Sequence, residues 1–321
     1  MYGKSAYYSG NYTVVCQLTE IIKPDDQIIQ RDTDVFYCLG HSLIKADRFS
    51  EAIGYLEKLY KINHARNVTY LLGCSYAHLG QSRNNDELIE KALYWFNVSL
   101  NSNSEHAEAY LQRANLFLLK GQFAEAHADL EKSLILRNNN PDASYALGVY
   151  HHLTGDNEKA LEVFRDIIAL NPSHHQSILA LGLISEEKND LENALNYYLQ
   201  VLPYNNTPEF HLRIGAVYCK SGNGTKATEN LALAQQNGAQ NKELKYYQGW
   251  SHALLHDFES AYDSLVEIVD KPTLSPIAFL AAKQRFEQND YARCINYWKS
   301  CEMDTTKQLP YQAEHVRNHL A

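Results

Sequence analysis

The stretch ALGVYHHLTGDNEKALEVFRDIIALNP, residues 146–172, has the pattern of two amphipathic helices joined by a tight turn. Apolar residues recur every three to four positions on both sides of Gly155-Asp156-Asn157, which is the spacing of helices that each bury one face. Glycine ends a helix well because it adopts left-handed backbone angles, and Asp or Asn starts one by accepting a backbone N–H. The stretch therefore predicts an antiparallel helix pair.

Three columns of residues indicate that this helix pair is one unit of a repeat with a period of 33 to 34 residues. The first column holds small residues: Gly40, Gly73, Ala114, Gly148, Gly182, Gly215, Gly249 and Ala282. The second, twelve residues further on in most units, holds Ala52, Ala92, Ala126, Ala160, Ala194, Ala227, Ala261 and Cys294. Four residues later come Leu56, Phe96, Leu130, Phe164, Tyr198, Leu231, Leu265 and Trp298. Helices that cross closely need small side chains at the contact and a large one beside it, and one pair cannot bury its apolar stripe alone, so the pairs must stack.

This pattern closely resembles the tetratricopeptide repeat family, with residues 146–172 as its best instance. The resemblance implies an all-α fold: a right-handed superhelical solenoid of antiparallel helix pairs, whose first helices line a concave groove for peptides or partner helices. We expect a single solenoid over residues 1–321. It comprises a partial repeat at 1–32, eight repeats at 33–308 with an insertion at about 81–91, and a capping helix at 309–321.

The second unit and the N-terminus depart from the regular pattern. The segment GQSRNNDELIEKA at 80–92 makes the second unit seven residues longer than its neighbours. With Asn85 or Asp86 as helix cap, we expect a longer turn and about one extra helical turn, which either contacts a partner or is a tolerated surface loop. Gly3 falls in the first small column, so the chain begins midway through a first helix. The uncovered apolar face there favours a fragment of a longer protein, a partner at that end, or self-association.

The resemblance also predicts which residues line the groove. The predicted groove residues are Tyr37, His41, Tyr70, Asn115, Tyr145, His152, Tyr246 and Trp250. Tyr and Trp are common binding hot spots because they bury large rigid area and keep a polar atom. An acidic edge runs beside them, through Asp34, Glu108, Asp142, Glu209 and Glu243. This groove favours an apolar or basic segment of a protein partner; alternatively, the tyrosines pack between helices and the acids complement helix dipoles.

Two histidine pairs, His151–His152 and His174–His175, are the strongest candidates for a metal or catalytic site. A zinc site needs further ligands at tetrahedral spacing, and the sequence offers neither an H-E-x-x-H motif nor paired cysteines. We therefore expect structural or peptide-contacting histidines, and no catalytic, metal-binding or cofactor-binding residues.

Composition excludes several classes of protein. The net charge of −9 argues against nucleic-acid binding, which requires a basic surface. No apolar run approaches the length of a membrane span, and six scattered cysteines without a C-x-x-C pair suit reduced thiols in the cytoplasm.

The preferred function is a non-enzymatic protein-interaction scaffold, as a subunit of a larger complex. The alternative is a substrate-recruiting arm or fragment of a larger enzyme such as a glycosyltransferase, although only Asn67 and Asn115 stand where such an arm has an asparagine ladder. A self-contained enzyme is least favoured because the repeats occupy nearly every residue. The family's carboxylate clamp for chaperone C-terminal tails needs lysine in the column that holds Tyr37, Tyr70, Leu111 and Tyr145, so we expect no binding of such tails.

Overall fold

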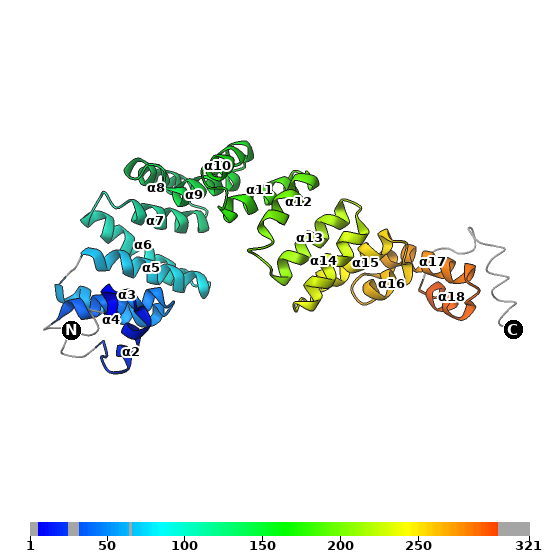
Figure 1. Cartoon of the computed structure of the whole chain (residues 1–321), viewed down its shortest axis with the longest axis horizontal. Helices are drawn as coiled ribbons and strands as arrows, with labels where there is room; N and C mark the ends of the chain where they lie inside the picture. Colours follow the sequence, from blue (N-terminus) through cyan, green and yellow to red (C-terminus); the bar gives the residue numbers. More distant parts are fainter. Residues whose placement is uncertain (1–5, 25–31, 64–65, 301–321) are drawn as a thin grey trace. The chain divides into compact units, whose positions relative to one another are not determined.

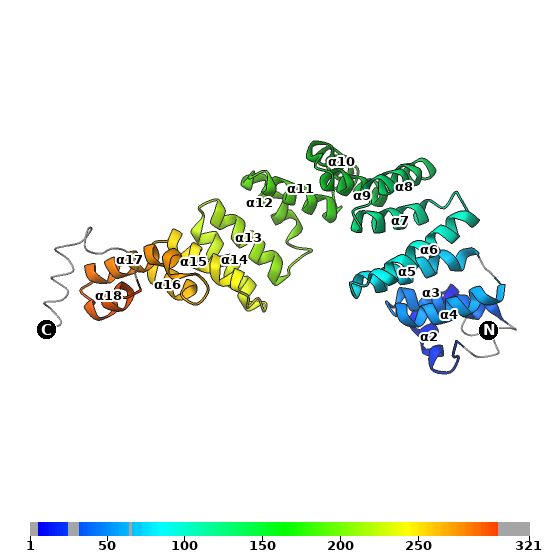
Figure 2. The same cartoon turned by 180° about the vertical axis from the view of Figure 1, so that it is seen from behind.

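The structure is a computed structural model that describes residues 6–24, 32–63 and 66–300. Within these ranges every regular element is a helix, and successive helices form antiparallel pairs (Figures 1 and 2). The predicted all-α fold of stacked helix pairs is confirmed. In the same ranges, no helix combines the length and the apolar content needed to cross a membrane.

The chain divides into two compact units, Met1–Ile167 and Ile168–Ala321. The first begins with α2 (Tyr12–Gln17), η1 (Leu18–Glu20), α3 (Thr33–Lys45), α4 (Phe49–Asn63), α5 (Arg66–Ser82), α6 (Asp86–Ser102), α7 (Ala107–Leu119) and α8 (Phe123–Leu136). It continues with α9 (Pro141–Leu153) and α10 (Asn157–Leu170), whose last turn belongs to the second unit. That unit contains α11 (His175–Glu187), α12 (Leu191–Val201), α13 (Pro208–Lys220), α14 (Gly224–Gln236), α15 (Lys242–Leu254), α16 (Phe258–Leu265), α17 (Lys271–Glu287) and α18 (Tyr291–Trp298). A single solenoid over the whole chain stays a prediction, and the expected capping helix at 309–321 lies outside the described residues.

The predicted columns of small residues lie at the contacts within each pair. A Cβ added to Gly148 would lie 2.5 Å from Cε1 of Phe164, and one on Gly182 would lie 2.6 Å from Cε1 of Tyr198. The alanines of the second column, such as Ala160, are fully buried. A Cβ at Gly148 would require the Phe164 ring or its helix to shift, which explains the small residue there.

Each pair is closed by a three-residue turn with a left-handed residue at its centre. Gly155 has φ 85°, and Asp47, Asn84, Asn189, His256 and Asn289 have φ between 47° and 61° at the same place in their turns. The next residue caps the following helix: the Asp190 carboxylate accepts a 3.3 Å hydrogen bond from the Asn193 N–H. This turn satisfies the first N–H groups of the second helix and reverses the chain in the fewest residues.

The insertion lengthens both helices of its pair and leaves the turn unchanged. Helix α5 ends nine residues after Gly73, whereas α9 ends five residues after Gly148, its counterpart in the repeat. Helix α6 begins six residues before Ala92, whereas α10 begins three residues before Ala160. The expected longer turn is therefore wrong. Asn84 adopts φ 47°, which closes the hairpin in three residues, so the added residues continue the helical hydrogen bonds. One of the two predicted caps is confirmed, since the Asn85 side chain accepts a hydrogen bond from the Leu88 N–H.

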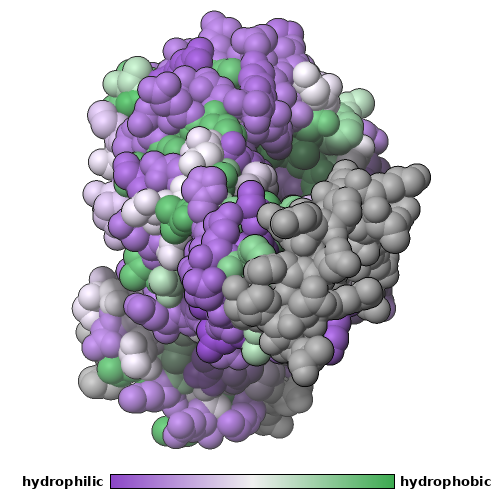
Figure 3. Space-filling view, turned by 90° about the vertical axis from the view of Figure 1, so that its right-hand side faces the viewer, coloured by the Kyte–Doolittle hydropathy of each residue, from purple (hydrophilic) through white to green (hydrophobic). Residues whose placement is uncertain are grey.

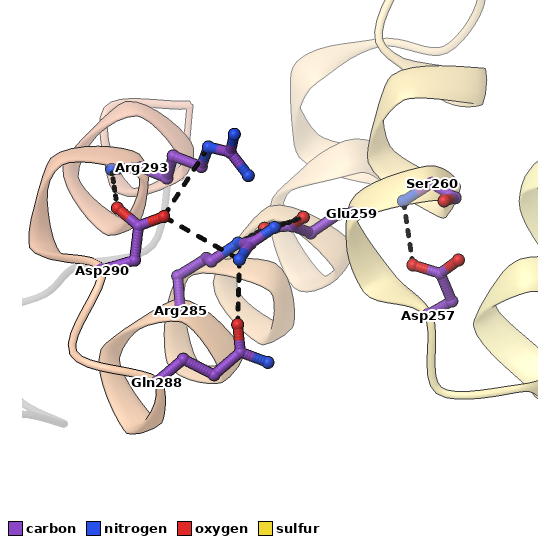
Figure 4. A network of polar contacts seen from close by, with 7 residues as sticks. All are labelled: Asp257, Glu259, Ser260, Arg285, Gln288, Asp290 and Arg293. Atoms are coloured by element: carbon purple, nitrogen blue, oxygen red, sulfur yellow. Dashed lines mark hydrogen bonds and ion pairs between the residues drawn. The ribbon is translucent and has the colours of Figure 1, made fainter.

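A partly buried ion pair joins the last two described helix pairs, α15–α16 and α17–α18 (Figure 4). The Arg285 guanidinium of α17 pairs with both carboxylate oxygens of Glu259 on α16, and each side chain is about one-fifth exposed. Arg285 also donates to Gln288 at 2.9 Å and lies 3.8 Å from Asp290, which caps α18 through the Arg293 N–H. Arg285 lies three residues after Ala282 of the first column, and the equivalent position holds an apolar or aromatic residue in several other units, such as Leu43 and Phe117. An ion pair therefore replaces apolar packing at this junction.

Candidate protein-binding surface

Tyr37 and His41, at the start of the predicted groove, pack against the N-terminal segment of the chain. Their rings stack with centroids 6.2 Å apart, and the Tyr7 hydroxyl lies 3.2 Å from Nδ1 of His41. Burial lowers the pKa of His41, with Lys45 adding to the effect, and burial raises the pKa of Tyr7 to about 12. Tyr7 therefore covers part of both predicted residues, while Tyr8 beside it is 77% exposed.

Tyr70 and Tyr145 lie against aromatic rings of neighbouring elements. The Tyr70 ring is 4.5 Å from His106 and 6.1 Å from Phe96, and burial raises its pKa. The Tyr145 ring is 5.5 Å from Phe164, and burial likewise raises its pKa. These contacts favour packing as the role of the two residues, which is the alternative left open by the sequence.

The four histidines of the two pairs have structural neighbours. His152 Nδ1 lies 2.8 Å from Oδ1 of Asn157, and burial lowers the pKa of His151. His174 caps α11 by accepting a 3.2 Å hydrogen bond from the Ser177 N–H. The rings of His175 and Tyr204 stack with their centroids 3.7 Å apart.

Across residues 6–24, 32–63 and 66–300, no three His, Cys, Asp or Glu side chains converge as metal ligands would. Asn115, the remaining predicted residue of this unit, is partly exposed on α7.

In the second unit, α15 presents three aromatic rings in contact with one another. Tyr247 and Trp250 are nearly parallel, with centroids 6.0 Å apart and an angle of 16°. Tyr246 meets both rings edge-on, at 5.3 and 6.2 Å, and is 44% exposed. Tyr246 and Trp250 are among the predicted groove residues. Tyr247 is not, because it lies one residue after the position that Tyr246 occupies in the repeat. Its spacing of three residues from Trp250 is the signal that identifies it.

Charged residues on α11 and α13 form a hydrogen-bonded cluster in the same unit. The Glu186 carboxylate accepts hydrogen bonds from the Tyr198 hydroxyl at 2.8 Å, from Lys220 at 2.7 Å and from Arg213 at 3.2 Å. Burial alone raises the pKa of Glu186, but the hydrogen bonds from Lys220 and Tyr198 outweigh it and hold the pKa below its usual value. Two cations therefore share one carboxylate, and the cluster has a net positive charge.

This charged cluster lies close to the aromatic rings of α15. The Cys219 thiol of α13 donates to the Tyr247 carbonyl at 3.5 Å, which ties the two helices together. The pKa of Tyr247 is raised chiefly by burial; the Lys220 charge lowers it, and Glu243, Tyr246 and Glu186 raise it, so charges of both signs act on the phenol. We call the set formed by Glu186, Arg213, Lys220, Tyr246, Tyr247 and Trp250 the cationic–aromatic surface.

Most of the molecular face drawn in Figure 3 is hydrophilic, and hydrophobic residues gather on it only in small groups. Other large apolar residues of the second unit are exposed too, such as Leu233 on α14, which is 42% exposed. Single exposed apolar residues are normal on a protein surface, whereas three contacting aromatic rings beside two cations are a specific feature.

Comparison with known proteins identifies the repeats. The middle tetratricopeptide-like domain of cilia and flagella-associated protein 70 matches residues 114–237. The crystal structure of PilW, a type IV pilus biogenesis factor, superposes with a TM-score of 0.54 at 14% identity, covering 64% of this chain and 93% of PilW. A tetratricopeptide repeat protein from Parabacteroides merdae superposes with a TM-score of 0.51 at 13% identity, over 77% of this chain and 97% of that one.

The chain is a tetratricopeptide-repeat protein. At these identities the two solved structures show the fold alone. This tetratricopeptide-repeat protein is also similar to the BBSome complex member BBS4 of Bos taurus, at 23% identity over 76% of this chain and 46% of BBS4. It is 25% identical to the human protein O-mannosyl-transferase TMTC3, over 74% of this chain and 30% of TMTC3. The chain thus spans about half of the first relative and about a third of the second.

Proposed function

We propose that this tetratricopeptide-repeat protein is a non-enzymatic interaction scaffold whose cationic–aromatic surface binds a segment of a partner protein. The observation that carries the proposal is the exposed Tyr246 ring, in contact with Tyr247 and Trp250. The Lys220 charge acts on Tyr247, and Lys220 shares the Glu186 carboxylate with Arg213. Tyr, Trp and Arg dominate binding hot spots because they bury large area and form directional contacts.

The charge of this surface suggests the chemistry of the partner. The acidic edge predicted from the sequence favours a basic segment of the partner. However, Glu108 is already paired with Arg137. Glu209 and Glu243 lie in the first turns of their helices, where acidic side chains interact favourably with the helix dipole. Among the residues that the structure describes, Lys220 and Arg213 both pair with Glu186, so a partner carboxylate completes the pairing. We expect an apolar or aromatic residue of the partner to pack on Tyr246 with an acidic residue next to it.

Membership of a larger complex is the second part of the proposal. Similarity to BBS4, described as a BBSome complex member, supports a role as a complex subunit. Similarity to TMTC3, described as an O-mannosyl-transferase, supports the alternative of a substrate-recruiting arm of a glycosyltransferase. In both roles the repeats hold another protein. The proposal of a complex subunit includes a cytoplasmic location.

Site-specific photocrosslinking tests the surface directly. A benzophenone amino acid is placed at Tyr246 of the full chain, and, as a control, at Tyr94, an equally aromatic residue that is 57% exposed on α6. We expect a protein adduct from position 246 that is lost in a Lys220→Glu, Arg213→Glu background and absent from position 94. The same adducts from both positions, or adducts at 246 that ignore the charge reversal, would contradict the proposal.

A further inference from the structure

The lengthened hairpin of α5 and α6 forms a pocket with the neighbouring turn between α7 and α8. The pocket has a volume of about 360 Å³, and its lining includes Gln81, Asn84, Asp86, Ile89, Leu119 and Lys120. It exists because the insertion extends α5 and α6 toward the end of α7. The volume is at the lower end of the range for ligand sites, which suits one side chain better than a whole segment.

The lining of the pocket combines apolar and polar side chains. Of the apolar ones, Ile89 is buried and Leu119 is 61% exposed. Gln81, Asn84 and Asp86 contribute amide and carboxylate groups. A long side chain with an aliphatic stem and a polar head matches this lining, since the stem covers apolar surface and the head reaches the polar groups.

Electrostatics at the pocket favours a cation. Helices α5 and α7 both end there, at Ser82 and Leu119, and helix C-termini carry partial negative charge. Lys120 is paired with Glu90, so it does not neutralise Asp86. In the described part of the chain Asp86 has no ion pair. The partial positive charge at the N-terminus of α6 disfavours a cation, but the Asn85 side chain already accepts a hydrogen bond from the Leu88 N–H there.

We infer that this pocket binds an arginine side chain of a partner protein. The aliphatic stem lies between Ile89 and Leu119, and the guanidinium donates to the Asp86 carboxylate and to the side-chain carbonyl oxygens of Gln81 or Asn84. Arginine fits better than lysine because its planar head donates to several acceptors at once. This site lies in the first unit and is independent of the cationic–aromatic surface in the second.

Peptide titration of the full ¹⁵N-labelled chain tests the inference by NMR. The probe is acetyl-Gly-Arg-Gly-amide, and its matched control contains citrulline, which keeps the shape of arginine and removes the charge. We expect the arginine peptide to shift the amide signals of residues 80–89 and 119–120, and the citrulline peptide to bind about tenfold more weakly. Shifts confined to other residues, or no shifts at millimolar peptide, would overturn the inference.

Three substitutions separate this site from a general charge effect. Asp86→Asn removes the proposed acceptor charge and Leu119→Ser removes the exposed apolar side chain, so each should weaken the arginine peptide severalfold. Glu87→Gln removes one negative charge at the next residue, whose carboxylate is paired with Lys91, and should leave the affinity unchanged. If Glu87→Gln weakens binding as much as Asp86→Asn, or if citrulline binds as well as arginine, the pocket does not recognise a guanidinium.

Discussion

The Tyr198 hydroxyl donates a 2.8 Å hydrogen bond to the Glu186 carboxylate across the hairpin of α11 and α12. Tyr198 fills the large-residue column with a fully buried ring, as Leu or Phe does in most other units. The phenol adds one polar atom at the edge of that ring, and the atom is satisfied by Glu186. A residue of the packing column thereby orients the carboxylate that holds Lys220 and Arg213 in place.

Glu186→Gln should destabilise the protein by about 1 kcal/mol at pH 7, because the hydrogen bonds from Lys220 and Arg213 lose their ionic character. The pKa of Glu186 is lowered below 4.5 in the folded state, so its contribution is complete above pH 4.5 and is lost as the pH falls through the folded value. Urea unfolding at pH 7 and at pH 3 measures this. A gap between wild type and variant that stays constant with pH contradicts the assignment.

Gly148→Ala should lower stability although alanine is the better helix former. The added Cβ would meet Cε1 of Phe164 at 2.5 Å, and overpacking costs about 1–3 kcal/mol against a gain of about 1 kcal/mol in helix propensity. The double variant Gly148→Ala, Phe164→Leu recreates the Ala114–Leu130 combination and should recover part of the loss. Melting temperatures of the two single variants and the double variant give the coupling, and strict additivity would refute the contact.

Arg113→Met should destabilise the first unit by about 3 kcal/mol, because it leaves the Asp129 carboxylate buried without its partner. Two guanidinium nitrogens donate to Asp129 at 2.7 Å each, and the Asp129 side chain is only 8% exposed. Replacing both residues, as Arg113→Met with Asp129→Leu, should restore most of the stability since no unpaired charge remains. Hydrogen exchange of α7 and α8 reports this locally, and a double variant as unstable as the single one would count against the explanation.

Tyr145→Ala and Tyr246→Ala should differ in stability although both residues lie three positions before the small residue of their unit, Gly148 and Gly249. Removing the Tyr145 ring opens a space beside Phe164 and should cost about 2 kcal/mol, whereas the 44% exposed Tyr246 should cost about 0.5 kcal/mol. Chemical unfolding of both variants decides the point. Equal losses would mean that Tyr246 also serves packing and is a poor candidate for binding.

The sequence predicts the helix pairs well because each pair repeats the same packing problem. Gly148 opposite Phe164 and Gly182 opposite Tyr198 follow from a period that eight units confirm independently. The tip of the second pair was harder to predict. Asn84 closes a three-residue turn in a left-handed conformation, which asparagine adopts almost as readily as glycine. From the sequence alone, an asparagine-rich segment is equally compatible with a longer loop.

Which aromatic residues are exposed was not predictable from the column alone. Tyr70 and Tyr145 each meet a phenylalanine of the third column, Phe96 and Phe164, whereas the pair that contains Tyr246 has Leu265 there. The charged cluster was missed for a different reason. Glu186 and Lys220 are 34 residues apart, one full repeat, so a side-chain bond between successive units leaves no local pattern in the sequence.

The seven added residues of α5 and α6 correspond to about two helical turns at 3.6 residues per turn, one in each helix. An addition of that length returns the chain to the same phase, so Gly80 and Ile89 at the tip stay buried, as do Gly73 and Ala92 below them. A hairpin of this architecture can therefore grow at its free end without re-registering any of its neighbours. Evolution can lengthen single units in steps of seven and give one edge of the stack a new recognition element while its core is inherited unaltered.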